Sequence, residues 1–233
     1  AIDEVRIEPV AHPHRRDRSC PGHRLGADVG VILVNKESKL KDLGELLSTL
    51  KENPSKLTTG GSSPVGGWDH LRLLLTAKKS GVGGPDLRKI RWIQYDGGGH
   101  AVTQLLGKHV DVVTTDIGEI AGFIEAGEVR VLGVMSDERL PAPFANIPTL
   151  KEQGVDFVGY NWRGFYTGGK VPDDAYDWWV DTLKKLYESP EWKETAKKHG
   201  LTPLWRGGEQ FVTFVKESIA DTREVSREIG VIK

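Results

Sequence analysis

Apolar and polar residues alternate along the chain with two different periods. Short runs of β-branched residues and leucine, such as "VGVILVN" at 29–35, are typical of buried strands. Longer stretches such as 38–54 repeat leucine at spacings of three and four, which places the leucines on one side of a helix. In that stretch Ser38 is the predicted helix cap and Pro54 the predicted stop.

The same two patterns predict the remaining elements, and clusters of glycine and proline separate them. Near the C-terminus, Ser189 is the predicted cap of a helix that starts at Pro190 and stops at Gly200. Further strands are predicted at 56–61, 90–95, 110–116, 129–135, 163–168 and 202–206, and further helices within 62–79, 100–108, 118–127 and 172–189 and from Gly208 onward.

Strands that alternate with helices at this spacing predict an α/β fold with a mostly parallel sheet. The alternation is unbroken over 35–162, so we expect this span to form one nearly complete lobe. Residues 1–34 and 163–233 are helix-rich with few strands, and we expect them to form part of a second lobe.

Composition removes several classes of protein. A formal net charge of −1 over 233 residues gives no basic face for nucleic acid. No apolar run approaches the roughly 20 residues that span a bilayer, and the sequence shows no export leader. Cys20 is the single cysteine, which excludes an intramolecular disulfide.

Residues 12–24 differ from the rest of the chain because they contain almost no apolar residue. The side chains of His12, His14, Cys20 and His23 are types that zinc accepts, but their spacing lacks the paired pattern of a structural zinc site. We therefore predict no metal and no cofactor, and we expect an irregular or foreign segment here.

Two glycine-rich turns, "GGSSPVGGWDH" and "YDGGGH", each follow a predicted strand and precede a predicted helix. Ligands gather at the carboxyl ends of parallel strands, where helix N-termini aim free N–H groups outward. Ser62 and Ser63 add hydroxyl groups, and "TTD" ends a third strand. Neither turn matches a phosphate-binding template, so the pattern favours a small anion such as a carboxylate.

Catalysis has little support in the sequence. There is no G-x-S-x-G motif and no paired acid and base. His70, His100 and His109 lie at or near predicted helix ends, where a histidine is commonly a packing or capping residue. We predict that the chain is not an enzyme.

Four blocks, in order and spacing, carry a resemblance to a known family. They are "KLTTGGSSPVGGWDHL", "IQYDGGGHAVTQLLGKHVDVV", "IEAGEVRVLGVMSDERLPAPFANIPTLKEQGVDF" and "WRGFYTGGKVPDDAYDWW". From about Val29 onward the chain resembles the tripartite tricarboxylate transporter substrate-binding proteins, the Bug or TctC-like family. The resemblance implies a two-lobed, periplasmic-binding-protein-like (type II) fold, a carboxylate solute bound between the lobes, periplasmic location and delivery to a membrane transporter.

The resemblance also implies which residues contact the ligand. Asp96 departs from the basic residue often found in the family at its position, and Arg163 is a candidate for the compensating charge. The implied ligand-binding residues are Ser62, Ser63, Gly66, Tyr95, Gly97, Gly98, Gly99, Thr115, Asp116 and Arg163.

Family members have a signal peptide and part of the first lobe before the block that matches Val29. The resemblance therefore implies that this chain lacks these parts, and that residues 12–28 interrupt a matching region, as a frameshift would. We expect weakened binding and an apolar face left partly open on the C-terminal helices, with Trp178, Trp179 and Phe211 as its candidates.

Two other functions stay open. Regulators of the LysR type carry a similar two-lobed effector domain, but they need an N-terminal DNA-binding domain of about 60 residues. A hydrolase or isomerase acting on a carboxylate would use His70 or His100, without a nucleophile that the sequence identifies.

Overall fold

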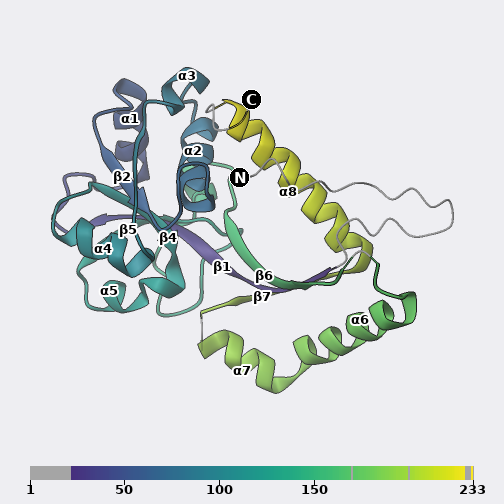
Figure 1. The fold of residues 1–233 in the computed structure, drawn as a ribbon. Helices are drawn as coiled ribbons and strands as arrows, with labels where there is room; N and C mark the ends of the chain where they lie inside the picture. The colour runs from purple at the N-terminus through teal and green to yellow at the C-terminus, as the bar shows by residue number, and fades with distance from the viewer. Residues whose placement is uncertain (1–21, 169, 199, 229–231, 233) are drawn as a thin grey trace. The chain divides into compact units, whose positions relative to one another are not determined.

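A computed structural model describes residues 22–168, 170–198, 200–228 and 232 (Figure 1). The chain divides into two compact units. Unit 1 contains the chain up to Ala27 together with Trp162–Asp221, and unit 2 contains Asp28–Asn161 and Thr222–Lys233. The assignment of 35–162 to one lobe of a binding protein, and of 1–34 with 163–233 to the other, stays a prediction.

Unit 2 is built on five strands in the order β3-β2-β4-β1-β5. β2 is parallel to both β3 and β4, as the βαβ pattern predicts. β1 is antiparallel to β4 and to β5 and lies between them. The strands are β1 (Gly22–Asn35), β2 (Thr58–Gly61), β3 (Arg91–Gln94), β4 (Val112–Asp116) and β5 (Val129–Val134).

The direction of β1 differs from the expectation of a mostly parallel sheet. Val31, Ile32, Leu33 and Val34 are all fully buried, because β1 is a central strand covered on both faces. A strand buried on both faces is a continuous apolar run in either direction, so its composition does not reveal whether it is parallel.

Helices cover both faces of the unit 2 sheet. Ile32 and Val34 of β1 pack in one core with α1 and α2, whereas Val31 and Leu33 pack in a second core with α4. The helices are α1 (Leu43–Glu52), α2 (Trp68–Lys79), α3 (Gly84–Leu87), α4 (Gly98–Leu106) and α5 (Ala121–Glu125), with single 3₁₀ turns η1 (Ile117–Glu119) and η2 (Lys151–Gln153).

The start of α1 corrects one prediction. The N-cap is Asp42, whose Oδ1 accepts a hydrogen bond of 2.9 Å from the Glu45 N–H. Ser38 lies in the preceding turn, where its Oγ accepts from the Leu40 N–H at 3.2 Å. Both residue types are good caps, and the turn at 38–40 separates Ser38 from the helix.

The N-terminal part of β1 corrects a second prediction, because β1 begins at Gly22, whereas the sequence predicts an irregular segment over 12–24 and a strand from Val29. In unit 1 this part pairs antiparallel with β7, from His23 opposite Gly207 to Ala27 opposite Thr202. Arg24 is buried there, its guanidinium 4.9 Å from the centre of the Phe214 ring. Because a buried arginine takes the place of an apolar residue in this part of the strand, the sequence pattern does not indicate a buried strand here.

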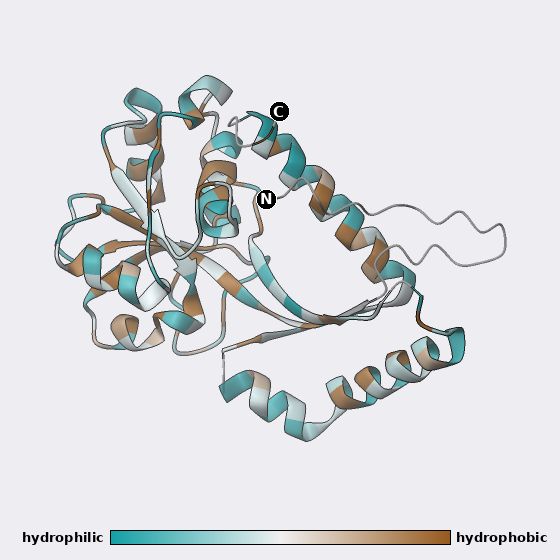
Figure 2. Cartoon of the chain, in the orientation of Figure 1, coloured by the Kyte–Doolittle hydropathy of each residue, from teal (hydrophilic) through white to brown (hydrophobic). Residues whose placement is uncertain are grey.

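Unit 1 contains the remaining elements, and both β6 and β7 pair with β1. The Ser189 Oγ accepts from the Trp192 N–H at 3.2 Å, which confirms Ser189 as a cap. Apolar and polar residues alternate along α6 and α8 (Figure 2). The elements are β6 (Tyr160–Tyr166), α6 (Asp173–Glu188), α7 (Pro190–Lys198), β7 (Thr202–Gly207) and α8 (Gly208–Glu228). Tyr160 and Asn161 at the start of β6 and the last turns of α8 belong to unit 2.

The expected open apolar face of unit 1 is partly wrong. Phe211 is fully buried and its ring lies 5.5 Å from that of Trp162. Trp178 and Trp179 of α6 are 59% and 43% exposed, as expected. The aromatic side chain of Phe211 is buried in the first turns of α8 among Trp162 and Phe214.

Candidate functional site

One edge of the unit 2 sheet brings the predicted turns together. β3, β2 and β4 are parallel neighbours, so their carboxyl ends lie at the same edge. The turn 62–67 follows β2, the turn 95–97 follows β3, and Thr115 and Asp116 end β4. Of the ten predicted ligand residues, Arg163 is the exception, because it lies on β6 in unit 1.

Internal hydrogen bonds shape the turn after β2. The Ser63 Oγ accepts from the Asp69 N–H at 2.9 Å and so satisfies one N–H of the first turn of α2, whose N-cap is Gly67. Gly66 has a φ of +82°, which favours glycine, and its N–H donates to Nδ1 of His70 at 3.0 Å. The serine and the histidine thus hold the loop that precedes α2.

The hydroxyl and the amide of Ser62 are both engaged. The Ser62 N–H and Oγ–H donate to Oδ2 of Asp69, at 3.0 and 2.5 Å. Ser62 is a predicted ligand donor, but these two hydrogen bonds orient it toward Asp69 within the protein. Sequence reasoning did not single out Asp69, which is buried on α2.

Asp116 is engaged in a similar way. Its Oδ1 accepts from Nη1 of Arg72 at 2.6 Å, and its Oδ2 accepts from Nδ2 of Asn161 at 2.6 Å. The second terminal nitrogen of Arg72, Nη2, donates to Oδ1 of Asp69. Arg72 is fully buried and was also missed. The available signal was an arginine amid leucines in "HLRLLL", three residues after an aspartate on one helix.

The start of α4 is the open part of this edge. Gly97 is its N-cap with a φ of +88°, and the first N–H groups of any helix have no partner within it. A Cβ atom at Gly97 or Gly99 would meet no described heavy atom within 4 Å. Two of the three glycines therefore have open space beside them at the start of the helix.

Gly98 has a different role from the one predicted. A Cβ atom there would overlap the Thr115 Oγ1 and the Glu119 Oε2. These two atoms form a hydrogen bond of 2.6 Å, with the threonine as donor. Gly98 is thus needed for close packing of α4 against the end of β4.

Burial changes the chemistry of His70. Its side chain is 5% exposed, and desolvation lowers its pKa from 6.5 to about 4. The ring is therefore neutral at pH 7, which suits an Nδ1 that accepts from Gly66. Its ring centre lies 5.0 Å from that of Trp92, whose Nε1 donates to the Ser63 carbonyl at 2.9 Å.

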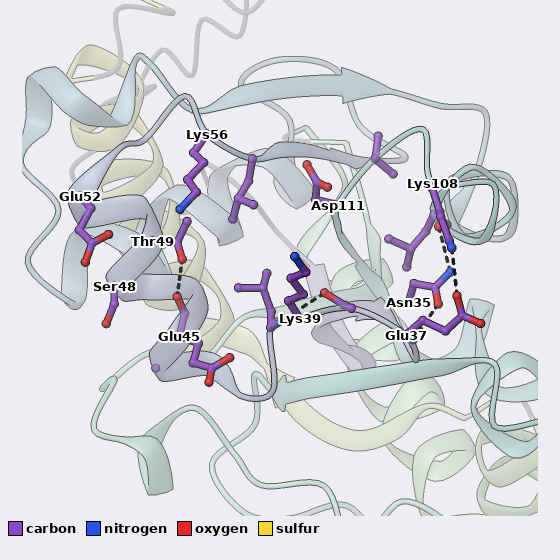
Figure 3. Close-up of a pocket in the computed structure, with 16 residues that line it drawn as sticks. Asn35, Glu37, Lys39, Glu45, Ser48, Thr49, Glu52, Lys56, Lys108 and Asp111 are labelled. Carbon is purple, nitrogen blue, oxygen red and sulfur yellow. Dashed lines mark hydrogen bonds and ion pairs between the residues drawn. The ribbon is translucent and has the colours of Figure 1, made fainter.

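A groove of about 860 Å³ lies at the opposite edge of the sheet, at the start of β2 and β4 (Figure 3). Its lining mixes three lysines with four acidic residues, and Lys108 pairs with Glu37 at 3.0 Å. A carboxylate would meet both signs of charge there. The charged residues of the lining are Lys39, Lys56, Lys108, Glu37, Glu45, Glu52 and Asp111.

Two other expectations concern a metal site near the N-terminus and membrane-spanning helices. His12, His14 and Cys20 lie outside the described residues, and of His23 the backbone alone is described, so the absence of a metal stays a prediction. Within the described ranges, no helix combines the length and the apolarity that crossing a bilayer requires.

Comparison with known proteins gives consistent relatives. The family model described as "Tripartite tricarboxylate transporter family receptor" (TctC) matches residues 24–231. A UPF0065 protein of Cupriavidus necator is 27% identical over 87% of this chain and 59% of its own length. Protein BugT of Bordetella pertussis is 26% identical, with 87% of this chain and 60% of BugT covered. The chain thus spans about three fifths of the length of these relatives.

Solved structures confirm the predicted α/β, periplasmic-binding-protein-like fold. A TctC solute binding protein from Polaromonas has a TM-score of 0.72 and 23% identity, covering 88% of this chain and 68% of that one. The periplasmic binding protein BugD has a TM-score of 0.70 and 25% identity, covering 91% and 70%. With the family match over almost the whole described chain, the conclusion follows that this protein belongs to the tripartite tricarboxylate transporter receptor (TctC) family.

Proposed function

We propose that this chain binds a small carboxylate at the carboxyl edge of the unit 2 sheet. The observation that carries the proposal is the start of α4, where a Cβ at Gly97 or Gly99 would meet no described heavy atom within 4 Å and where no described side chain caps the first N–H groups. Such a helix end favours an anion, both through hydrogen bonds and through the helix dipole.

The internal contacts of this edge support a fixed site. Ser62 and Asp116 are held by Asp69 and Arg72, so the two turns beside α4 are already ordered. A site that is ordered before binding loses less conformational entropy when the ligand arrives. Arg163 of unit 1 remains a proposed contact for the same ligand.

Relatives narrow the ligand class. Two solved structures of similar fold were obtained with dicarboxylates, an R. palustris protein with adipate and MatC of Rhodopseudomonas palustris with malate. Their TM-scores to this chain are 0.71 and 0.70. We propose a dicarboxylate of about that size for this chain, bound and released without chemical change.

The wider role follows from the family. We propose that the protein works in the periplasm and delivers its ligand to the membrane components of a tripartite tricarboxylate transporter.

Calorimetric titration with malate, adipate and citrate, alongside their methyl esters, tests the binding. The expected result is binding of at least one free acid and none of its ester. A ligand at about 10 mM is at roughly 100 times a Kd of about 0.1 mM, and it stabilises a protein that binds it by about 2.7 kcal/mol. A purified, folded chain that binds no carboxylate at this concentration would overturn the proposal.

A pair of glycine variants locates the site. Gly99→Val places a branched side chain in the space before α4, and we expect it to abolish binding. Gly83→Val is the control, because Gly83, the N-cap of α3, also has open space at its Cβ but lies between the end of α2 and the start of β3. Equal affinities for the two variants would show that the start of α4 is not the site.

A further inference from the structure

Arg72 is a buried cation in the middle of an apolar helix. It is fully buried on α2, and its neighbours Leu71, Leu73 and Leu74 are buried core residues. A charge in such a place is tolerated when it is paired and hydrogen-bonded. Its two terminal nitrogens have carboxylate partners, whereas Nε has no partner among the described atoms.

The partners of Arg72 form one continuous chain of hydrogen bonds. It runs from Ser62 to Asp69, from Asp69 to Arg72, from Arg72 to Asp116, and from Asp116 to Asn161. These residues come from the turn after β2, from α2, from the end of β4 and from the start of β6. The chain of bonds thus joins a turn of the proposed site to the last residue of the 28–161 segment of unit 2.

Two glycines allow the guanidinium to lie against the backbone at this point. A Cβ at Gly30 would be 2.5 Å from Nη1 of Arg72, and one at Gly159 would be 3.0 Å from its Cδ. The Gly159 carbonyl accepts from Nη1 and from the Gly30 N–H, both at 3.3 Å. Gly30 lies on β1 and Gly159 precedes β6, the two strands that continue from unit 2 into unit 1.

We propose that Arg72 is a positioning residue that makes the turn at Ser62 and the segment Gly159–Asn161 move together. One cation holds two carboxylates inside the protein, so a shift of either carboxylate weakens the contacts of the other. The coupling is carried by contacts within unit 2. That a bound carboxylate uses it to act on the strands leaving unit 2 rests on the proposed function.

Amide hydrogen exchange on the full chain tests the coupling without any ligand. Asp69→Asn removes the charge next to Ser62 and leaves Gly159–Asn161 untouched in sequence. We expect about tenfold faster exchange at the Gly159 amide, which donates to the Met135 carbonyl, besides faster exchange at Ser62. Asn161→Ala should in turn speed exchange at Ser62.

Asp111→Asn is the matched control, because the Asp111 carboxylate also accepts a backbone N–H, that of Thr58 at 2.8 Å, at the opposite edge. Its effect should stay at Thr58. If Asp69→Asn and Asn161→Ala each change exchange at their own end alone, the coupling is absent and the proposal is wrong.

A further arm separates this inference from the proposed function. Malate added to the native chain should slow exchange at both Ser62 and Gly159, and Arg72→Lys should reduce the effect at Gly159 at least threefold while that at Ser62 persists. If Asp69→Asn and Asn161→Ala each speed amide exchange at the far end, but no carboxylate changes exchange, the role of Arg72 is upheld and the proposed carboxylate binding is refuted. If malate slows exchange at Gly159 as much in Arg72→Lys as in the native chain, the role of Arg72 is refuted.

Discussion

Single residues of the edge carry chemistry that depends on their burial, and His70 is the clearest case. Its pKa is lowered by burial from 6.5 to about 4, so between these values the unfolded chain binds a proton that the folded chain does not. Stability therefore falls as the pH drops from 6.5 toward 4, and this loss is complete below about 4. At 1.36 kcal/mol per pKa unit, the contribution is about 3 kcal/mol.

Urea unfolding at pH 7 and at pH 4.5 measures this dependence. The His70→Gln variant keeps an acceptor for the Gly66 N–H but has no group that titrates in this range. We expect its free energy of unfolding to fall less between the two pH values than that of the native chain. An identical fall in both proteins would show that His70 is not the source.

The glycines of the 97–99 run should respond differently to alanine. Gly98→Ala forces a Cβ against Thr115 and Glu119, and overpacking of this kind costs about 1–3 kcal/mol. Gly99→Ala has open space and gains helix propensity of up to about 1 kcal/mol. Thermal unfolding of the two variants distinguishes them, and equal melting temperatures would contradict the assigned roles.

Sequence reasoning reached the edge but not its internal partners. Glycine, serine and aspartate after successive strands indicated where a ligand site lies, because parallel strands end together. Which polar groups bond to each other depends on side chains from distant segments, such as Asp116 with Arg72 and Asn161. That pairing has no signature in local spacing.

Elements follow local patterns more closely, and their ends test the reasoning. Asp42 caps α1 through the Glu45 N–H, so Asp42→Ala should lower the free energy of unfolding by about 1 kcal/mol. Ser38→Ala, which removes a hydroxyl from the preceding turn, should change it by less than half of that. Equilibrium unfolding in urea gives both values, and a larger effect at Ser38 would restore the original prediction.

The predicted helices and strands are present because apolar periodicity reports burial of one face. The same periodicity missed α3, a single turn led by Pro85 that is too short to show a period. It also missed 22–28 of β1, where Arg24 takes a buried position that an apolar residue usually occupies. Whether a strand runs parallel or antiparallel to its neighbours depends on the sheet as a whole, so the local pattern does not show it.

At the scale of the molecule, β1 belongs to both units. His23–Ala27 pairs with β7 in unit 1, and Gly30–Asn35 pairs with β4 and β5 in unit 2. Loss of one unit would remove the partners of a strand that the other unit needs. We therefore expect a single transition in differential scanning calorimetry, and two well-separated transitions would contradict this.

The central position of β1 also has a consequence in time. Its apolar residues reach their partners Val113 and Val131 after about 80 to 100 more residues have been made. At roughly 5–20 residues per second of synthesis, the strand waits on the order of 4–20 seconds without a neighbour on either side. During that interval the nascent chain exposes an apolar strand without hydrogen-bond partners. The yield of folded protein in the cell should therefore depend on chaperones that shield newly made chains.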